Sequence, residues 1–308
     1  MTKPLEGKAA VVTGGGRGVG RAIAIDLAAH GARVVVNDIG AARDGGGTDQ
    51  TPAEEVVATI REAGGTAIAN YNPIDDYNGG GQLVQACANE FGSIDILVNC
   101  AGVLRERMIW NMSEDDWDTV IRVHLKGHYN TCHHAAKLMR TQRSGVMINV
   151  SSTAWLGTVG QSNYGAAKAG IVGLTRALAR ELGRYDVRVN ALCPSAATRM
   201  TLDEGVINGM RKRLEAGLIS QERFERFMEM PGPEFVPPIV TYLASDEAKH
   251  VTGKVFYASK GKIAIFTEPV ELHSIHKGDD GLFTFEELKS IAPSSLLQDY
   301  VSPVPKQS

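Results

Sequence analysis

The 308-residue chain has no long hydrophobic run, no excess of either charge and no paired cysteines. Without a stretch of about 18 apolar residues, a membrane-spanning helix is not expected. Thirty-two basic residues stand against 35 acidic ones, so neither nucleic acid nor an anionic membrane is a predicted partner. The four cysteines form no CxxC pair, the histidines form no metal-ligand set, and no apolar signal segment is present. A cytoplasmic location without a bound metal is therefore expected.

Short runs of apolar, β-branched residues alternate with longer helical stretches along most of the chain. This alternation is typical of a parallel sheet covered by helices on both faces. The predicted fold class is therefore α/β, a doubly wound parallel sheet of the Rossmann type. Strands are predicted at Ala9–Thr13, Arg33–Asp38, Thr66–Tyr71, Ile94–Asn99, Val146–Ser152, Val187–Cys193 and Lys254–Ser259. Helices are predicted at Gly18–His30, Ala53–Ala63, Leu83–Phe91, Trp117–Arg140 and Tyr164–Leu182.

Two stretches interrupt this alternation. Gly40–Gln50 is a polar loop after the second strand, and Met200–Met230 is charged and helical. Because the second stretch follows the sixth strand, at the edge where ligands bind, a substrate lid is predicted over residues 200–232; an ordinary surface helical hairpin is the alternative. We expect one dinucleotide-binding domain over residues 1–260, which includes the lid, and a C-terminal extension over residues 261–308.

A glycine-rich turn, TGGGRGVG at residues 13–20, follows the first predicted strand and opens the first helix. A pyrophosphate approaches the N–H groups of a helix N-terminus only where no Cβ blocks it. A tight turn without a ligand is the alternative, but Asp38 closes the next strand 18 residues beyond Gly20. A carboxylate there accepts hydrogen bonds from an adenosine ribose and repels a 2′-phosphate, which predicts NAD over NADP. Arg17 favours NADP instead, since a cation in this loop could bind that 2′-phosphate.

Tyr164 and Lys168 lie four residues apart, on one face of a predicted helix. The strand before this helix ends at Ser151 and Ser152, at the edge of the sheet where ligands bind. A surface Tyr–Lys pair is the alternative interpretation. A phenol, an ammonium and a hydroxyl together suit hydride transfer at a carbonyl carbon. The cation is expected to lower the pKa of the tyrosine, which exchanges a proton with the substrate oxygen while the serine holds that oxygen.

These motifs resemble those of the short-chain dehydrogenases/reductases from about Leu5 to Ala258. The TGxxxGxG pattern is residues 13–20, NNAG is residues 99–102 with cysteine in second place, and YxxxK is residues 164–168. The resemblance implies Tyr164 as the acid/base, Lys168 as a ribose ligand that lowers the tyrosine pKa, and a homodimer or homotetramer. It also implies that the cofactor contacts Thr13, Gly14, Gly16, Arg17, Gly18, Val19, Gly20, Asp38, Asn72, Asn99, Ala101, Gly102, Tyr164, Lys168, Pro194 and Thr198.

Some positions depart from the family pattern or leave alternatives open. Asn72 stands where the family usually has an aspartate, and Thr198 is alternatively a helix N-cap. Counting 13 residues back from Tyr164 predicts Ser151 as the catalytic serine, whereas aligning the strand end predicts Ser152, with one residue lost from the following loop. Adjacent strand residues face opposite ways, so only one is catalytic, and Ser152 is preferred because deletions fall more easily in loops.

His124 takes the place of the family's asparagine in the long helix. It is either a buried histidine with one satisfied nitrogen or a link in a proton path from Lys168 to water. The segments VVVNDIG (34–40), GGTAIANY (64–71), SEDDWD (113–118) and RVHLKG (122–127) resemble one branch of the family. That branch is the (3R)-hydroxyacyl-CoA dehydrogenase domain of peroxisomal multifunctional enzyme type 2, with its stand-alone bacterial relatives.

This branch implies a small-molecule substrate, a (3R)-hydroxyacyl-CoA. The enzyme would interconvert it with the corresponding ketone, with NAD as the cofactor. The alternatives are a hydroxysteroid or another bulky secondary alcohol and, in a different class, a non-catalytic dinucleotide sensor on the same fold. In the predicted lid, Arg211, Lys212 and Arg213 would either meet a CoA phosphate or form a solvated helix face.

Overall fold

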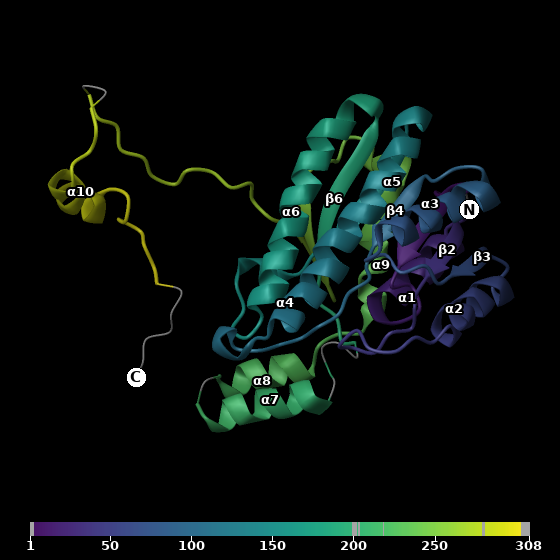
Figure 1. The fold of residues 1–308 in the computed structure, drawn as a ribbon, viewed down its shortest axis with the longest axis horizontal. Coiled ribbons are helices and arrows are strands. Elements are labelled where there is room, and N and C mark those ends of the chain that lie inside the picture. The colour runs from purple at the N-terminus through teal and green to yellow at the C-terminus, as the bar shows by residue number, and fades with distance from the viewer. Residues whose placement is uncertain (1–2, 199–201, 203, 218, 279–280, 303–308) are drawn as a thin grey trace. The chain divides into compact units, whose positions relative to one another are not determined.

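The computed structural model describes residues 3–198, 202, 204–217, 219–278 and 281–302. Within these residues the strands are β1 (Ala9–Thr13), β2 (Arg33–Asn37), β3 (Thr66–Asn70), β4 (Ile96–Asn99), β5 (Gly145–Val150), β6 (Val187–Pro194), β7 (Val255–Ser259) and β8 (Lys262–Ile265). They form one sheet in the order β3-β2-β1-β4-β5-β6-β7-β8 (Figure 1). Strands β1 to β7 are parallel, which confirms the predicted fold class, and β8 pairs antiparallel with β7.

The described helices are α1 (Gly18–Ala29), α2 (Thr51–Glu62), α3 (Tyr77–Phe91), α4 (Glu114–Ile121), α5 (Gly127–Gln142), α6 (Ser162–Leu182), α7 (Glu204–Glu215), α8 (Gln221–Met228), α9 (Pro237–Ala244) and α10 (Phe285–Ile291). Alternate side chains of the central strands enter two apolar layers. Val12 and Val36 pack in the layer with α1, α2 and α9, whereas Val11 and Leu97 pack in the layer with α3, α5 and α6. Both faces are covered, so these strands are apolar along most of their length, with polar residues such as Thr13 and Asn99 at their carboxyl ends.

The helix predicted at Trp117–Arg140 is not regular. Ser113 begins α4 with a capping box that Asp116 completes, and a π-helical turn at Arg122–Lys126 separates α4 from α5. Such turns widen the helix by one residue and are frequent at functional sites. The two sides of the turn pack differently, since Val120 of α4 lies with Ala167 of α6, whereas Met139 of α5 lies in the layer with Val11 and Leu97.

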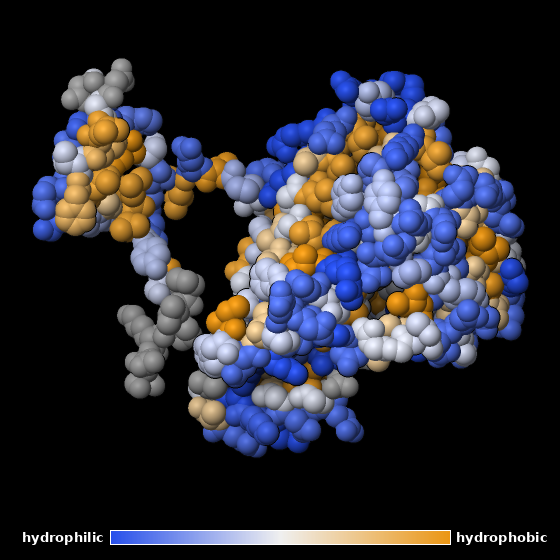
Figure 2. All heavy atoms as spheres, viewed as in Figure 1, coloured by the Kyte–Doolittle hydropathy of each residue, from blue (hydrophilic) through white to orange (hydrophobic). Residues whose placement is uncertain are grey.

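The predicted lid lies partly outside the described residues, which omit 199–201, 203 and 218. Its helices α7 and α8 pack against each other, and their described residues are all at least partly exposed. Figure 2 shows mostly hydrophilic residues over this helix pair on the viewed face. None of the described helices is long and apolar enough to cross a membrane.

The chain divides into two compact units, Met1–Phe266 and Thr267–Ser308. The first contains the whole sheet, including β8, which begins just beyond residue 260. In the second unit, Thr284 caps α10 through a capping box with Glu287, and Lys277 lies 3.0 Å from that carboxylate. The functional division into a dinucleotide-binding domain and an extension stays a prediction.

Candidate active site

Most of the predicted site residues gather at the carboxyl ends of the parallel strands, where such sheets bind ligands. A cavity of about 400 Å³, here called the inner cavity, lies at this edge. Of the predicted residues, Thr13, Gly16 and Asn99 do not line it. The predicted residues that do are Gly14, Arg17, Gly18, Val19, Gly20, Asp38, Asn72, Ala101, Gly102, His124, Ser151, Ser152, Tyr164, Lys168, Pro194 and Thr198.

The turn between β1 and α1 has no room for side chains. A Cβ on Gly14 would lie 2.7 Å from the Cα of Ala101, and one on Gly20 would lie 2.1 Å from the Gly14 oxygen. Gly14 and Gly18 also have φ angles of 64° and 54°, which favour glycine. The first residues of α1 line the inner cavity, and helix N-termini carry N–H groups without intrahelical acceptors. This cradle therefore fits a pyrophosphate.

Asp38 and Arg17 are both fixed at the end of β2. The Asp38 carboxylate accepts hydrogen bonds from the N–H groups of Gly16 at 2.9 Å and Gly40 at 2.7 Å. The Arg17 guanidinium donates to two carbonyls of the following loop, at 3.3 and 3.4 Å, and lies 3.6 Å from Asp49. The loop thus already engages the Arg17 charge. A carboxylate and a guanidinium therefore both lie at this end of the inner cavity, each already held by neighbouring groups.

Thr13 and Asn99 are fully buried beneath the inner cavity. The Thr13 hydroxyl accepts from the two N–H groups that follow Asn99, at 3.0 and 3.1 Å. The Asn99 amide donates to Asn149 at 3.0 Å and accepts from Thr131 at 2.7 Å. Both side chains therefore hold the turn at residues 100–102 in place, and the structure does not bring them to the cavity wall.

Helix α6 and strand β5 bring the predicted catalytic groups together. The Lys168 ammonium donates to the Val150 carbonyl at 2.7 Å and lies 5.3 Å from the centre of the Tyr164 ring. Ser152 forms a hydrogen bond with Tyr164. Ser151 is buried and donates instead to the Lys168 carbonyl at 2.9 Å. The geometry therefore favours Ser152 as the serine beside the phenol.

Burial has the largest effect on the pKa values of Tyr164 and Lys168. It raises the pKa of Tyr164 to about 12, although the hydrogen bond with Ser152 acts in the opposite direction. Burial also lowers the pKa of Lys168 to about 8. The expected lowering of the tyrosine pKa by the cation is therefore wrong for the protein's own groups. The physical reason is that desolvation penalises the phenolate, while the ammonium points at the Val150 carbonyl.

His124 lies in the π-helical turn, edge-on against Tyr164 with the ring centres 5.1 Å apart. Its Nε2 lies 3.1 Å from the Val103 nitrogen and 2.8 Å from the Val103 oxygen, so the tautomer decides which contact it makes. Its Nδ1 is buried without a partner among the described residues. Burial holds the pKa of His124 well below its usual range. The structure thus shows a buried, uncharged histidine, and a proton path from Lys168 stays a prediction.

Glycine is needed beside this imidazole, because a Cβ on Gly102 would lie 2.2 Å from the His124 ring.

A second histidine that no motif marks, His128, follows one helical turn after His124. It is fully buried, and neither ring nitrogen has a hydrogen-bond partner among the described residues. Burial, followed by the Lys168 charge, lowers the pKa of His128 to about 3, so this ring is also neutral.

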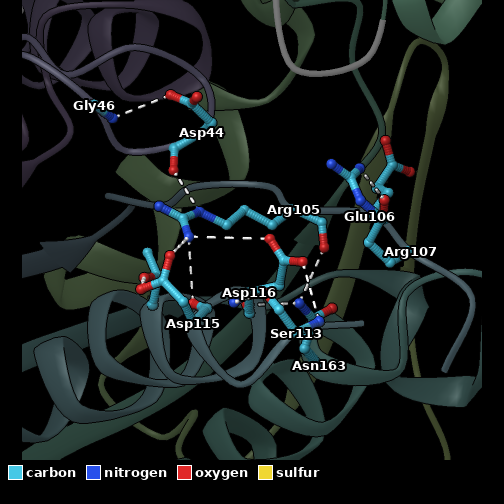
Figure 3. A network of polar contacts seen from close by, with 10 residues as sticks. Asp44, Gly46, Arg105, Glu106, Arg107, Ser113, Asp115, Asp116 and Asn163 are labelled. Carbon is cyan, nitrogen blue, oxygen red and sulfur yellow. Dashed lines mark hydrogen bonds and ion pairs between the residues drawn. The ribbon is translucent and has the colours of Figure 1, made fainter. Parts of the chain in front are cut away.

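A polar network that sequence reasoning missed holds the start of α6. The buried Asn163 amide donates to the carbonyls of Arg105 at 3.0 Å and Asp116 at 2.9 Å, and accepts from the Tyr164 N–H at 2.8 Å. Figure 3 shows the Arg105 side chain reaching across α4 to Asp115 and Asp116. Asparagine in a first helical turn was the available signal, and it is weak.

A second cavity, here called the outer cavity, has a volume of about 800 Å³ and meets the inner cavity at Ser152 and Tyr164. Its walls are the loop after β4, the loop before α6 and the helices α7 and α8. Val206, Met210 and Phe227 give it an apolar side. The phenol and the serine hydroxyl therefore lie where a molecule in one cavity meets a molecule in the other.

A dinucleotide-dependent oxidoreductase that acts on CH–OH donors needs two adjoining cavities, one with a cradle that fits a pyrophosphate and one open to a second molecule, and this protein has both. Residues 8–205 match the family model described as short chain dehydrogenase. The chain belongs to this family, whose members use NAD or NADP. The predicted resemblance is thereby confirmed.

Several known proteins are similar over most of the chain. A solved structure of a short chain dehydrogenase from Mycobacterium avium is 41% identical, with a TM-score of 0.79 over 98% of both chains. The hydroxyacyl-CoA dehydrogenase ChsB1 of Mycobacterium tuberculosis is 40% identical over 277 residues, which are 87% of this chain and 82% of that protein. The peroxisomal multifunctional enzyme type 2 of Mus musculus is 37% identical over 266 residues, which are 85% of this chain but only 33% of that enzyme.

Proposed function

We propose that this oxidoreductase uses NAD to interconvert a (3R)-hydroxyacyl-CoA and the corresponding 3-ketone. The observation that carries the proposal is the position of Tyr164 and Ser152 at the junction of the two cavities. The name of the similar protein from Mycobacterium tuberculosis, a hydroxyacyl-CoA dehydrogenase, supports the choice of substrate.

The inner cavity holds the cofactor in this proposal. The cradle at Gly14 to Gly20 takes the pyrophosphate, and Asp38 takes the adenosine ribose hydroxyls. NAD is favoured because Asp38 repels a 2′-phosphate and Arg17 is engaged by its own loop. When bound, the nicotinamide ring supplies the hydride acceptor or donor.

The chain's own groups manage the substrate oxygen and its proton. Ser152 donates a hydrogen bond to that oxygen and holds it beside Tyr164. With its pKa raised to about 12, Tyr164 keeps its proton at neutral pH and can give it to a ketone oxygen. In the oxidative direction the phenol must first lose this proton, so that it can accept the proton of the substrate hydroxyl.

A cytoplasmic location and a homodimer or homotetramer are part of the same proposal. In the predicted assembly, α4 with α5, together with α6, pack against their copies in a second subunit. Size-exclusion chromatography with light scattering distinguishes these assemblies from a monomer.

The test is the absorbance at 340 nm during incubation of the purified protein with a racemic 3-hydroxyacyl-CoA, a hydroxysteroid or a simple secondary alcohol, each with NAD and with NADP. Turnover of the CoA ester with NAD is expected. Turnover of the steroid alone would retain the chemistry and refute the substrate. Binding of NAD without turnover of any alcohol would instead support a dinucleotide sensor.

Tyr164→Phe tests the assigned acid/base. The variant keeps the ring that packs on His124 but loses the hydroxyl, so kcat should fall by at least about a hundredfold. NAD binding and the thermal unfolding temperature should stay close to those of the unaltered protein. Full activity of this variant would contradict the mechanism.

A further inference from the structure

The outer cavity carries an excess of positive charge that the reaction at Tyr164 does not require. Five arginines and three carboxylates are among the described residues that line it. Two of the arginines are engaged by acidic neighbours, since Arg43 lies 2.6 Å from Glu106 and Arg105 lies 4.0 Å from Asp116. The other oxygen of the Glu106 carboxylate accepts a hydrogen bond from a glutamine amide at 2.6 Å, so both of its oxygens already have a partner.

Arg107, Arg213 and Arg223 are the cavity's other arginines, and none has an ion-pair partner among the residues that the structure describes. They come from three separate segments: the loop after β4, helix α7 and helix α8. All three side chains are exposed. Cations that line one cavity without matching carboxylates create a positive potential that attracts an anion.

Two of these arginines belong to segments that approach the same turn of the chain, at Gly160. The Arg213 Nη2 lies 4.0 Å from the position that a Cβ on Gly160 would take. The N–H of Arg107 donates to the Gly160 carbonyl at 2.9 Å. Helix α7 and the loop after β4 therefore both approach this turn beside the outer cavity, and the Arg107 guanidinium donates to the Glu106 carbonyl at 2.8 Å.

The lid helices combine these cations with apolar side chains. Helix α7 presents Val206, Met210 and Arg213 to the cavity, spaced by one helical turn, and α8 presents Arg223 and Phe227 in the same way. Such walls suit a ligand that has a long uncharged arm and several phosphates. The apolar side chains can pack against the arm, and each guanidinium can bind two oxygens of one phosphate at once. A coenzyme A thioester has both parts. A steroid or a simple alcohol has no group that would use the three cations.

We propose that Arg107, Arg213 and Arg223 form a phosphate site at the mouth of the outer cavity. The site binds the nucleotide part of a coenzyme A thioester, while the thioester end reaches Ser152 and Tyr164. This inference rests on the proposed function, because the same molecule must reach the reacting groups. Of the three basic residues of α7 that the sequence offered as CoA-phosphate ligands, only Arg213 belongs to this site, since Arg211 and Lys212 do not line the cavity.

The first experiment compares Arg213→Ala and Arg223→Ala with the unaltered enzyme. Lys212→Ala is the matched control, because it removes one positive charge from the adjacent position of α7, outside the cavity. Each enzyme oxidises the same 3-hydroxyacyl group carried on coenzyme A or on N-acetylcysteamine, which lacks the nucleotide and all phosphates. Each arginine variant should raise KM for the CoA ester about five- to tenfold, with kcat little changed. KM for the short thioester should not move, and the control should match the unaltered enzyme.

The outcomes separate this site from the proposed reaction. An unchanged KM for the CoA ester in both arginine variants, with turnover intact, overturns the phosphate site and leaves the reaction standing. An equal rise in KM for both thioesters also overturns it, because the arginines would then act on the lid as a whole. A rise only for the same acyl group on an acidic carrier protein would assign these arginines to a protein partner and likewise refute the proposal.

A binding measurement keeps the inference testable if neither thioester is turned over. Coenzyme A alone is titrated calorimetrically into the protein in the presence of saturating NAD, which covers the inner cavity. We expect binding that weakens about fivefold or more in Arg213→Ala and not in Lys212→Ala. Absence of coenzyme A binding to the unaltered protein, or equal binding to all variants, overturns the site.

Discussion

Replacing Lys168 with methionine is expected to stabilise the fold at neutral pH while it abolishes the proposed reaction. The Lys168 side chain is only 3% exposed, and burial lowers its pKa from 10.5 to about 8. A shift of this size means that the folded state disfavours the charged form by about 3 kcal/mol. Methionine fills a similar volume without a charge but leaves the Val150 carbonyl without its donor, which costs about 1 kcal/mol. The net gain in unfolding free energy at pH 7 is therefore about 2 kcal/mol.

The sign of the pH dependence follows from the same shift. Between the folded-state pKa near 8 and the unfolded value of 10.5, the unfolded chain binds more protons at this lysine than the folded chain does. This residue's contribution to stability therefore rises with pH in that window. The advantage of Lys168→Met should persist below about pH 8 and fall to near zero at about pH 10.

The assay is urea unfolding followed by tryptophan fluorescence from pH 6 to pH 10, with both proteins at the same concentration, since an oligomer makes the apparent stability depend on it. Lys168→Arg is the control, because it retains a cation that does not titrate in this range. Equal stability of Lys168→Met and the unaltered protein at every pH would refute the reasoning, since burial of the charge would then have no measurable cost.

Three further outcomes are expected. Gly102→Ala forces a methyl group against the His124 ring, so the unfolding free energy in urea should fall by about 1–3 kcal/mol. Asp38→Asn removes the charge that repels a 2′-phosphate, so the NAD-to-NADP ratio of kcat/KM should fall by about tenfold; an unchanged ratio would remove Asp38 from cofactor selection. Ser152→Ala should lower kcat by about a hundredfold, whereas Ser151→Ala should retain activity and lose about 1 kcal/mol of stability, and the reverse pattern would assign catalysis to Ser151.

Local sequence patterns were sufficient to predict the architecture. The buried strands are apolar at consecutive positions because both faces of the sheet are covered, so β1 falls at the predicted residues and most other strands within one or two residues. The turn at residues 13–20 was recognisable because only glycine fits its contacts. The four-residue spacing of Tyr164 and Lys168 placed both on one face of α6, which depends on helical geometry alone.

Contacts between distant segments could not be predicted in this way. Thr13 and Asn99 belong to the family motifs, yet both are buried beneath the cavity, because their partners come from other strands and from α5. Which of Ser151 and Ser152 lies beside the Tyr164 phenol depends on how the chain turns after β5, next to α6. The π-helical turn around His124 depends on the space that Gly102 leaves.

The sequence by itself therefore determined the fold class and the family, and it predicted the reacting groups, since each follows from residue type and short-range spacing. Tertiary structure decided how these groups are charged and what surrounds them. Burial raises the pKa of Tyr164, against the direction expected from its proximity to Lys168, and lowers the pKa of Lys168, because desolvation depends on the whole surrounding fold. Arg107, Arg213 and Arg223 likewise share a cavity only because the loop after β4 and the helices α7 and α8 come together around it.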